Sequence, residues 1–507
     1  MLIDDVVAGL DNQGPRSYYA FETFVQNLLS HHIEKQNKAF EFGNNPFDRY
    51  DAFAPVGFDD FDGPVLFEIK FNLLSLVRLS HLRRILENYI EINAKKRFDH
   101  LIIVSAKRVP EKIFHELDFI REESDFPFEV HIWGPEDLNK IANKNKKFAV
   151  SIADKLFSLR INTAISKVVK DWKSERDEIL SNLKSRYEKG QFSLFLGAGV
   201  SSSAGMPDWN TLLNSLFVSY LTKEFNNDGA IGDQDIGDLV SRLNNINEPS
   251  ALMAARYLRK GLSKREGEAK DFIEAVTRNL YKLRAGDVPT ASALIKSISS
   301  MCQPRRTGAK VKSVVTYNFD DLLERQLEGD NILHRSIYTD TESYDPDELP
   351  VYHVHGFLPE NRKDYQGLEN STLVFSEEGY HQIYSESYHW SNLVQLNSFR
   401  ENCCLMIGLS MTDPNLRRLL DISSKNIERS KHFAFMKRLS SEEFCYETGE
   451  KGGRKKAVRN ADAAEKFLQR HHALNEELMR ELGVTIVWYE DYDEIPQFIR
   501  EVVRYEA

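Results

Sequence analysis

The residues from Gln191 to about Asn210 constrain the fold more than any other part of the chain. An apolar segment, FSLFL, runs directly into the glycine turn GAGVSSSAG, and a helical pattern begins after the turn. A buried strand that leads through a glycine turn into a helix is typical of α/β proteins with parallel sheets. We therefore expect an α/β domain that begins at residue 191.

Further apolar strands follow this turn, and helical patterns separate them. They are SVVTY (313–317), VYHVH (351–355), CCLMIGLS (403–410), KHFAFM (431–436) and VTIVWY (484–489). Strands that alternate with helices predict a doubly wound, Rossmann-like parallel sheet. Residues 212–300 show amphipathic helical patterns throughout, so we expect a helical layer inserted into a domain that spans residues 191–507.

A separate α/β domain is expected over residues 1–150. Its pattern is a helix (17–32), a strand-rich region (40–71), a helix (73–94) and two strands (100–105 and 128–133). Residues 151–190 are charged and helix-forming, with no Gly or Pro before Gly190, and predict a helical linker. A chain of 507 residues is too long for one core, which agrees with this division.

Composition excludes several classes of protein. The net charge of -11 argues against a non-specific coat on nucleic acid, so any contact with DNA would be local. No apolar run reaches the ~18–20 residues that cross a bilayer, and acidic residues open the chain where a secretory signal has basic ones. We therefore expect a cytoplasmic protein without membrane contact. Four cysteines without a C-x-x-C pair exclude a disulfide framework and a four-cysteine zinc site.

Polar residues mark the ends of two predicted strands. Asn318 and Asp320 come directly after SVVTY, and His355 closes VYHVH before Gly356. Ligands bind open α/β sheets at the carboxyl ends of the strands, so these residues and the glycine turn predict a ligand site. Each feature also has a structural explanation. Asp320 can cap a helix, and His353 is expected on the same strand face as His355, so pattern alone does not choose between the two histidines.

Four segments, in order, resemble the NAD-binding motifs of the sirtuin family: GAGVSSSAGMPDW, TYNFDD, HVHG and GLSMTDPNL. The resemblance covers about residues 191–507. It implies a set of residues that hold the dinucleotide: Gly197, Ala198, Gly199 and Ser201. It also implies that Gly408 and Ser410 close around the adenosine side.

The same resemblance implies the catalytic residues. Asn318 and Asp320 would line the nicotinamide and ribose pocket, and His355 would be the general base. Breaking the bond between nicotinamide and ribose leaves an oxocarbenium-like sugar, so the reaction needs polar groups that orient ribose and water, and a base with a pKa near working pH. Histidine meets the last requirement without large tuning.

The sequence also departs from the protein deacylases of this family. Those enzymes carry a zinc ribbon of two C-x-x-C pairs, which this chain lacks, so we expect no zinc and no deacylation. MPDWNTL replaces the usual Pro-Asp-Phe-Arg, and Tyr317 stands where Gln is common. The pattern is more similar to bacterial anti-phage sirtuin-like domains, which hydrolyse NAD to nicotinamide and ADP-ribose and thereby kill or arrest the infected cell.

The first domain contains two carboxylates and a lysine in a suggestive order. Asp51 precedes a strand that contains Glu68 and Lys70, and the latter two point to one face of it. Two carboxylates can hold Mg²⁺ at a phosphodiester while a lysine positions the water. The order resembles the D…E-x-K core of Mrr-type members of the restriction-endonuclease-like superfamily, which implies Glu22 as a further acid. The alternative is an ordinary half-exposed strand, because E-x-K is common there.

Three functions follow from these patterns. The first is an anti-phage effector, active in abortive infection, that hydrolyses NAD and senses or cleaves nucleic acid with its first domain. The second is an Mg²⁺-dependent nuclease whose sirtuin-like domain only binds an ADP-ribose-type nucleotide as a signal. The third is a non-catalytic scaffold that docks a defence partner, such as an Argonaute or a translocase ATPase. A toxic hydrolase must stay silent before infection, so we also expect a homo-oligomer or a partner that controls it.

Overall fold

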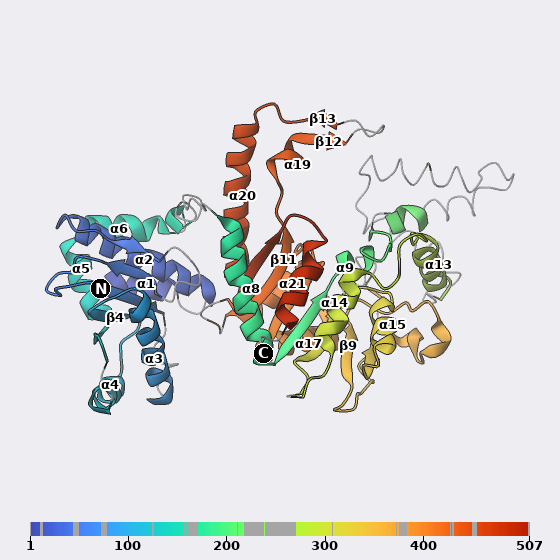
Figure 1. Ribbon diagram of the computed structural model, residues 1–507, viewed down its shortest axis with the longest axis horizontal. Coiled ribbons are helices and arrows are strands. Elements are labelled where there is room, and N and C mark those ends of the chain that lie inside the picture. The colour runs from blue at the N-terminus through green and yellow to red at the C-terminus, as the bar shows by residue number, and fades with distance from the viewer. Residues whose placement is uncertain are drawn as a thin grey trace. The chain divides into compact units, whose positions relative to one another are not determined.

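The computed structural model (Figure 1) describes residues 2–10, 14–43, 50–71, 79–123, 126–156, 158–160, 162, 171–209, 211–216, 238, 270–306, 308–371, 373–374, 383–386, 388–425, 427, 430–448 and 454–504. Most of the predicted helical insertion, residues 217–237 and 239–269, lies outside the described residues. The chain divides into two units. Unit 1 comprises Met1–Ile179, Ser424–Ser430 and Leu439–Thr485, and unit 2 comprises Leu180–Ser423, Lys431–Arg438 and Ile486–Ala507. The predicted boundaries at residues 150 and 190 remain predictions, because both units are discontinuous in sequence.

Unit 1 contains a five-stranded sheet in the order β1-β2-β3-β4-β5. Its strands are β1 (Glu41–Phe42), β2 (Ala52–Ala54), β3 (Val65–Lys70), β4 (His100–Ser105) and β5 (Glu129–Trp133). The first three pair antiparallel, and β3, β4 and β5 pair parallel. Parallel strands need helical crossovers, and α3 (Leu79–Lys95) and α4 (Glu111–Glu123) lie in these two connections.

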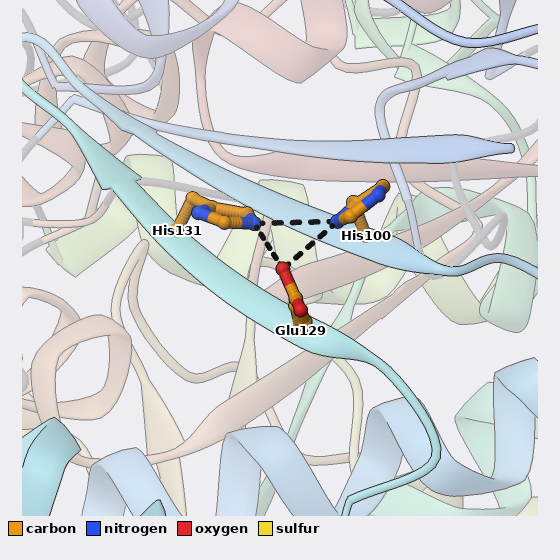
Figure 2. A group of neighbouring side chains, drawn as sticks. All are labelled: His100, Glu129 and His131. Atoms are coloured by element: carbon orange, nitrogen blue, oxygen red, sulfur yellow. Dashed lines mark hydrogen bonds and ion pairs between the residues drawn. The ribbon is translucent and has the colours of Figure 1, made fainter. Parts of the chain in front are cut away.

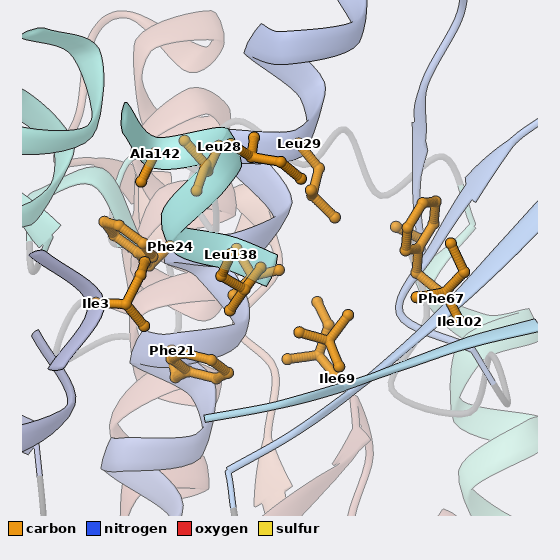
Figure 3. Close-up of a cluster of buried hydrophobic side chains, with 14 of the residues drawn as sticks. Ile3, Phe21, Phe24, Leu28, Leu29, Phe67, Ile69, Ile102, Leu138 and Ala142 are labelled. Atoms are coloured by element: carbon orange, nitrogen blue, oxygen red, sulfur yellow. The ribbon is translucent and has the colours of Figure 1, made fainter. Parts of the chain in front are cut away.

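The two faces of this sheet have separate hydrophobic cores, because side chains alternate along each strand. Phe67, Ile69 and Ile102 belong to the core shared with α1 (Leu2–Leu10), α2 (Pro15–Glu34), α5 (Pro135–Lys144) and α6 (Lys146–Asp154), part of which is shown in Figure 3. Leu66 and Leu101 belong to the opposite core with α3 and α4. Glu68 and Lys70 alternate with Phe67 and Ile69 and therefore face the second side.

A late segment of the chain also belongs to unit 1. It contains α19 (Ser441–Cys445), the antiparallel pair β12 (Tyr446–Thr448) and β13 (Arg454–Lys456), and α20 (Ala461–Glu481). Buried Arg160 forms ion pairs with Glu477 and, at 2.7 Å, with Glu481 of α20. These charge-assisted bonds join α20 to a segment more than three hundred residues earlier.

Unit 2 contains a seven-stranded sheet in the order β14-β11-β10-β6-β7-β9-β8. Its strands are β6 (Phe192–Leu196), β7 (Val311–Thr316), β8 (His334–Ile337), β9 (Leu349–His353), β10 (Cys403–Ile407), β11 (His432–Lys437) and β14 (Val484–Tyr489). The pairings from β8 through β11 are parallel. The predicted α/β class with a parallel sheet is confirmed.

Helices accompany the strands of unit 2. They are α9 (Ala198–Ser202), α13 (Lys270–Lys282), α14 (Ala293–Cys302), α15 (Leu322–Gly329), α17 (Trp390–Glu401), α18 (Pro414–Ser424) and α21 (Glu494–Val503), while α8 (Trp172–Glu188) leads into β6. In the sheet, β7 is the neighbour of β6 on one side, and β10, which comes later in the chain, is its neighbour on the other side. The strand order therefore reverses between β6 and β10, which is where open α/β sheets bind ligands. Among the described residues, no helix is long and apolar enough to cross a membrane.

Candidate functional site

The predicted glycines lie where the ends of β6 and β10 meet. Gly197 follows β6, and Gly408 follows β10 with a φ of 69°. The Gly199 amide donates a hydrogen bond of 3.0 Å to the Gly408 carbonyl. A Cβ on Gly197 would lie 2.5 Å from that carbonyl oxygen, and a Cβ on Gly408 would lie 2.7 Å from the Val200 nitrogen. The glycines are therefore required by the close approach of two backbone turns at the switch point.

Ser201 and Asp320 come together in the structure, although they belong to different motifs. Ser201 lies in α9, and its hydroxyl donates a hydrogen bond of 2.6 Å to Asp320 Oδ2. Asp320 also accepts a bond from the Leu322 amide at the start of α15, so the predicted capping role and a site role coexist. Burial raises the pKa of Asp320, and the Ser201 hydrogen bond acts in the opposite direction.

Asn318 links the end of β7 to the glycine turn. Its Nδ2 donates a hydrogen bond of 3.0 Å to the Gly197 carbonyl, and its backbone amide donates to the Thr316 hydroxyl at 3.1 Å. These two bonds fix the carboxamide at the carboxyl ends of the two central strands, while its Oδ1 atom remains an acceptor.

The two histidines have different environments. The prediction that His353 and His355 share one face of a strand is wrong, because β9 ends at His353 and the chain then turns, with Gly356 at a φ of 106°. Nδ1 of His353 lies within hydrogen-bonding distance of the Asn318 carbonyl oxygen, at 3.2 Å, and Nε2 lies 2.5 Å from Glu324 Oε1. Both nitrogens therefore face acceptors, and the ring contacts the backbone carbonyl of Asn318.

His355 packs against Tyr317, the residue that precedes Asn318. It is buried, and its centroid is 4.7 Å from that of Tyr317 in an edge-to-face arrangement. Burial lowers the pKa of His355 to about 4, although the negative charge of Asp413 acts in the opposite direction. The ring is therefore neutral at pH 7 and able to accept a proton. This pKa is lower than the near-neutral value expected from the sequence.

Two predicted residues lie at the margin of this cluster. Ala198 begins α9 directly after Gly197. Ser410 is exposed and forms a hydrogen bond of 2.6 Å with the Thr412 hydroxyl.

Sequence reasoning missed the residues that support the cluster. Glu324 is buried beside His353, and although burial opposes its ionisation, the charge of the imidazole prevails and lowers its pKa. Tyr317 donates a hydrogen bond to Gln395 of α17. Glu324 lies one helical turn beyond Asp320, which is the only sequence signal for it, and Gln395 has none.

A cavity of about 830 Å³ adjoins the predicted site, because Asp321 and Glu324 line it. Acidic residues outnumber basic ones in its lining, which includes Asp321, Glu324, Glu328, Glu360 and Asp364 together with Arg325 and His334. This sign of charge is unfavourable for a dinucleotide, which carries two phosphates. The dinucleotide site predicted at the β6–β10 switch point therefore remains a prediction.

In unit 1 the structure brings three of the four nuclease-like residues together. Asp51 continues the register of β2 with β3 and lies opposite Glu68, and the Ile69 amide donates to its Oδ2 at 2.5 Å. Glu68 is buried and forms an ion pair with Lys70. Glu22 is separate, on α2, and Gln26 bridges its carboxylate to the Asp51 carbonyl.

Comparison with known proteins supports the assignment of part of the chain. Residues 312–454 match the model of the SIR2-like domain family. The chain is also 22% identical, over 275 residues, to NAD(+) hydrolase ThsA of Enterococcus faecium. That match covers 53% of this chain and 48% of the relative, so the chain spans about half the length of the curated protein it matches. Asn318 and His355 thus lie in a segment similar to SIR2-like domains.

Proposed function

We propose that unit 2 hydrolyses NAD to nicotinamide and ADP-ribose and that the protein is an anti-phage defence effector. The convergence of Asn318, Asp320 and Ser201 beside the glycines of the switch point carries this proposal. The NAD hydrolase named among the relatives supports the same reaction class.

The proposed reaction assigns one role to each group. The bond from ribose C1′ to the nicotinamide nitrogen breaks, and nicotinamide leaves with the electron pair. A water oxygen bonds to C1′, and His355 accepts the proton that this water loses. Asn318 orients ribose or water through its Oδ1 atom, and Asp320 holds the position of α9 through Ser201. The products are nicotinamide, ADP-ribose and a proton.

The direct test is NAD turnover by the purified full chain, with and without added DNA, read by chromatography of nicotinamide and ADP-ribose. We expect Asn318→Ala and His355→Ala each to lose at least about a hundredfold in rate, which is the usual worth of a positioned acid–base group. His471→Ala, at an exposed position of α20, is the matched histidine control and should retain activity. Unchanged turnover in both site variants would refute the assignment.

A second function is favoured by the proximity of Asp51, Glu68 and Lys70. We propose that this site, similar in order to Mrr-type nucleases, senses or cleaves DNA. Asp51 and Glu68 offer hard oxygen ligands from adjacent strands and would hold Mg²⁺, which would polarise a phosphodiester when bound. Mg²⁺-dependent cleavage should be lost in Asp51→Ala and in Lys70→Ala. Cleavage that survives in both would show that other residues act.

Assembly and partners complete the proposal. A homo-oligomer, or a defence partner of the Argonaute or translocase ATPase class, would keep the hydrolase silent before infection. Size-exclusion chromatography with light scattering, alone and with DNA, tests the first arrangement. A monomer with full constitutive NAD hydrolysis would contradict both.

A further inference from the structure

Two histidines and a glutamate converge at one end of the sheet of unit 1. His100 is the first residue of β4, and Glu129 and His131 lie on the neighbouring strand β5. The parallel register places His100 beside Glu129, and alternation puts His131 on the same face. Figure 2 shows the three side chains pointing toward one common position from these two strands.

The separations of the three ligand atoms are those of a metal site. His100 Nδ1 is 3.4 Å from Glu129 Oε2, His131 Nε2 is 3.6 Å from the same oxygen, and the two nitrogens are 3.4 Å apart. Zinc bonds of about 2.0–2.2 Å in tetrahedral geometry require ligand atoms roughly 3.3–3.6 Å apart. The three atoms therefore form one face of a tetrahedron of the size that Zn²⁺ prefers.

A second, independent contact prepares His100 to be a ligand. Its Nε2 donates a hydrogen bond of 2.9 Å to the Asp62 carbonyl, so in the neutral ring Nδ1 carries the lone pair that faces Glu129 and His131. Metal-binding histidines usually donate their other N–H in this way, which fixes the tautomer and the ring orientation. The Phe61 ring packs on both imidazoles, with centroids 5.2 Å from His100 and 4.6 Å from His131.

The charges and exposure around the three residues are compatible with a divalent cation. Arg121 is a nearby positive charge, and its guanidinium donates a hydrogen bond to the Val130 carbonyl. The Glu129 carboxylate opposes that charge within the cluster, and its side chain is 72% exposed. An ion held by these three ligands would therefore keep its fourth position open to water.

We propose that His100, Glu129 and His131 form a binding site for a divalent transition metal, with Zn²⁺ as the preferred ion and water as the fourth ligand. The site joins the adjacent strands β4 and β5 where they begin. The sequence expectation of no zinc concerned cysteine ribbons, and this ligand set uses none. The inference does not depend on NAD hydrolysis, because all three ligands belong to unit 1.

The test is titration of the purified, chelator-treated full chain with Zn²⁺ by calorimetry, repeated with Co²⁺ because tetrahedral Co²⁺ has a distinctive visible spectrum. We expect one equivalent that is lost, or weakened by at least about tenfold, in Glu129→Gln and in His131→Ala. His115→Ala, at an exposed position of α4, is the matched control and should retain that equivalent. Glu129→Gln preserves the size of an exposed side chain, so it should fold normally.

Each outcome decides the proposal. Loss of one equivalent in both ligand variants, with retention in the control and a tetrahedral Co²⁺ spectrum, supports the site. Identical titrations of the wild-type chain and both ligand variants would overturn it, because the bound ion would then lie elsewhere. Absence of Zn²⁺ binding by the wild-type chain would overturn it as well.

Discussion

Substitution of Gly408 by alanine tests whether the site proposed at the β6–β10 switch point depends on the close approach of the turns that follow β6 and β10. Gly408 has a φ of 69°, and alanine in this left-handed region costs about 1–2 kcal/mol. Its Cβ would also lie 2.7 Å from the Val200 nitrogen and 3.0 Å from the Gly199 backbone, which must then move. Overpacking of this kind costs roughly 1–3 kcal/mol more. Gly408→Ala should therefore destabilise unit 2 by about 2–5 kcal/mol.

Gly367 provides the matched control for this substitution. Its φ of 70° is the same, but the nearest atom to an added Cβ is Asn370 Nδ2 at 3.8 Å. Gly367→Ala should therefore cost only the conformational part, about 1–2 kcal/mol. Hydrogen exchange of peptides from β6 and β10, measured at increasing urea, reports the stability of unit 2 alone. NAD turnover reports the activity proposed for the site at the β6–β10 switch point. Equal destabilisation and equal turnover in the two variants would refute the argument from close approach.

Three further predictions follow from buried charge. Arg160→Ala removes one of the two basic partners of Glu477 and leaves Arg480 at 3.6 Å, so it should destabilise unit 1 by about 2–3 kcal/mol in urea unfolding. Arg16→Ala, at a half-exposed ion pair, should cost at most about 1 kcal/mol, and similar costs would contradict the importance of burial. Burial lowers the pKa of His432 to about 3. The unfolded chain therefore binds a proton at this histidine below about pH 6.5, whereas the folded chain does so only near pH 3. Stability should fall between pH 6.5 and 3 by up to roughly 5 kcal/mol, and His432→Asn should remove one proton from the slope of unfolding free energy against pH. Because the pKa of His355 is lowered to about 4, NAD turnover should show no loss of its base form from pH 8 to 5, and a limb near pH 6.5 that depends on His355 would contradict its neutral state.

Hydrophobic pattern predicted where the strands of unit 2 lie but not where they end. FSLFL and CCLMI are buried strands in the structure, as expected from continuous apolar runs in a parallel sheet. The predicted strand at 403–410 nevertheless ends at Ile407, because Gly408 adopts a positive φ. Where a strand ends depends on the backbone angles of single residues, and a hydrophobic pattern does not predict those angles. For this reason the positions of His353 and His355 could not be distinguished before the structure.

The contacts that support the site could not be predicted, because they join residues far apart in sequence. Ser201 contacts Asp320 only once β6 and β7 pair, and Arg160 contacts Glu477 only once α20 packs within unit 1. His100 and His131 lack the short spacing of familiar zinc motifs, and only the register of β4 with β5 brings them together. Residue types at strand ends therefore led to the proposed site in unit 2, while the pairs within each site required the three-dimensional register.

The two proposed metal sites of unit 1 can be tested independently because they lie at opposite ends and on opposite faces of one sheet. Val65 pairs with His100 and Lys70 with Ser105, so Lys70 lies about five residues, roughly 17 Å, along the strand from the level of His100. His100 shares the face of Val65, whereas Glu68 and Lys70 alternate to the other face. Chelation would empty both sites, but single substitutions separate them. Glu129→Gln should abolish Zn²⁺ binding and leave any Mg²⁺-dependent cleavage of DNA unchanged, whereas Asp51→Asn should do the reverse. Simultaneous loss of both properties in either variant would show that the two sites are coupled through the sheet.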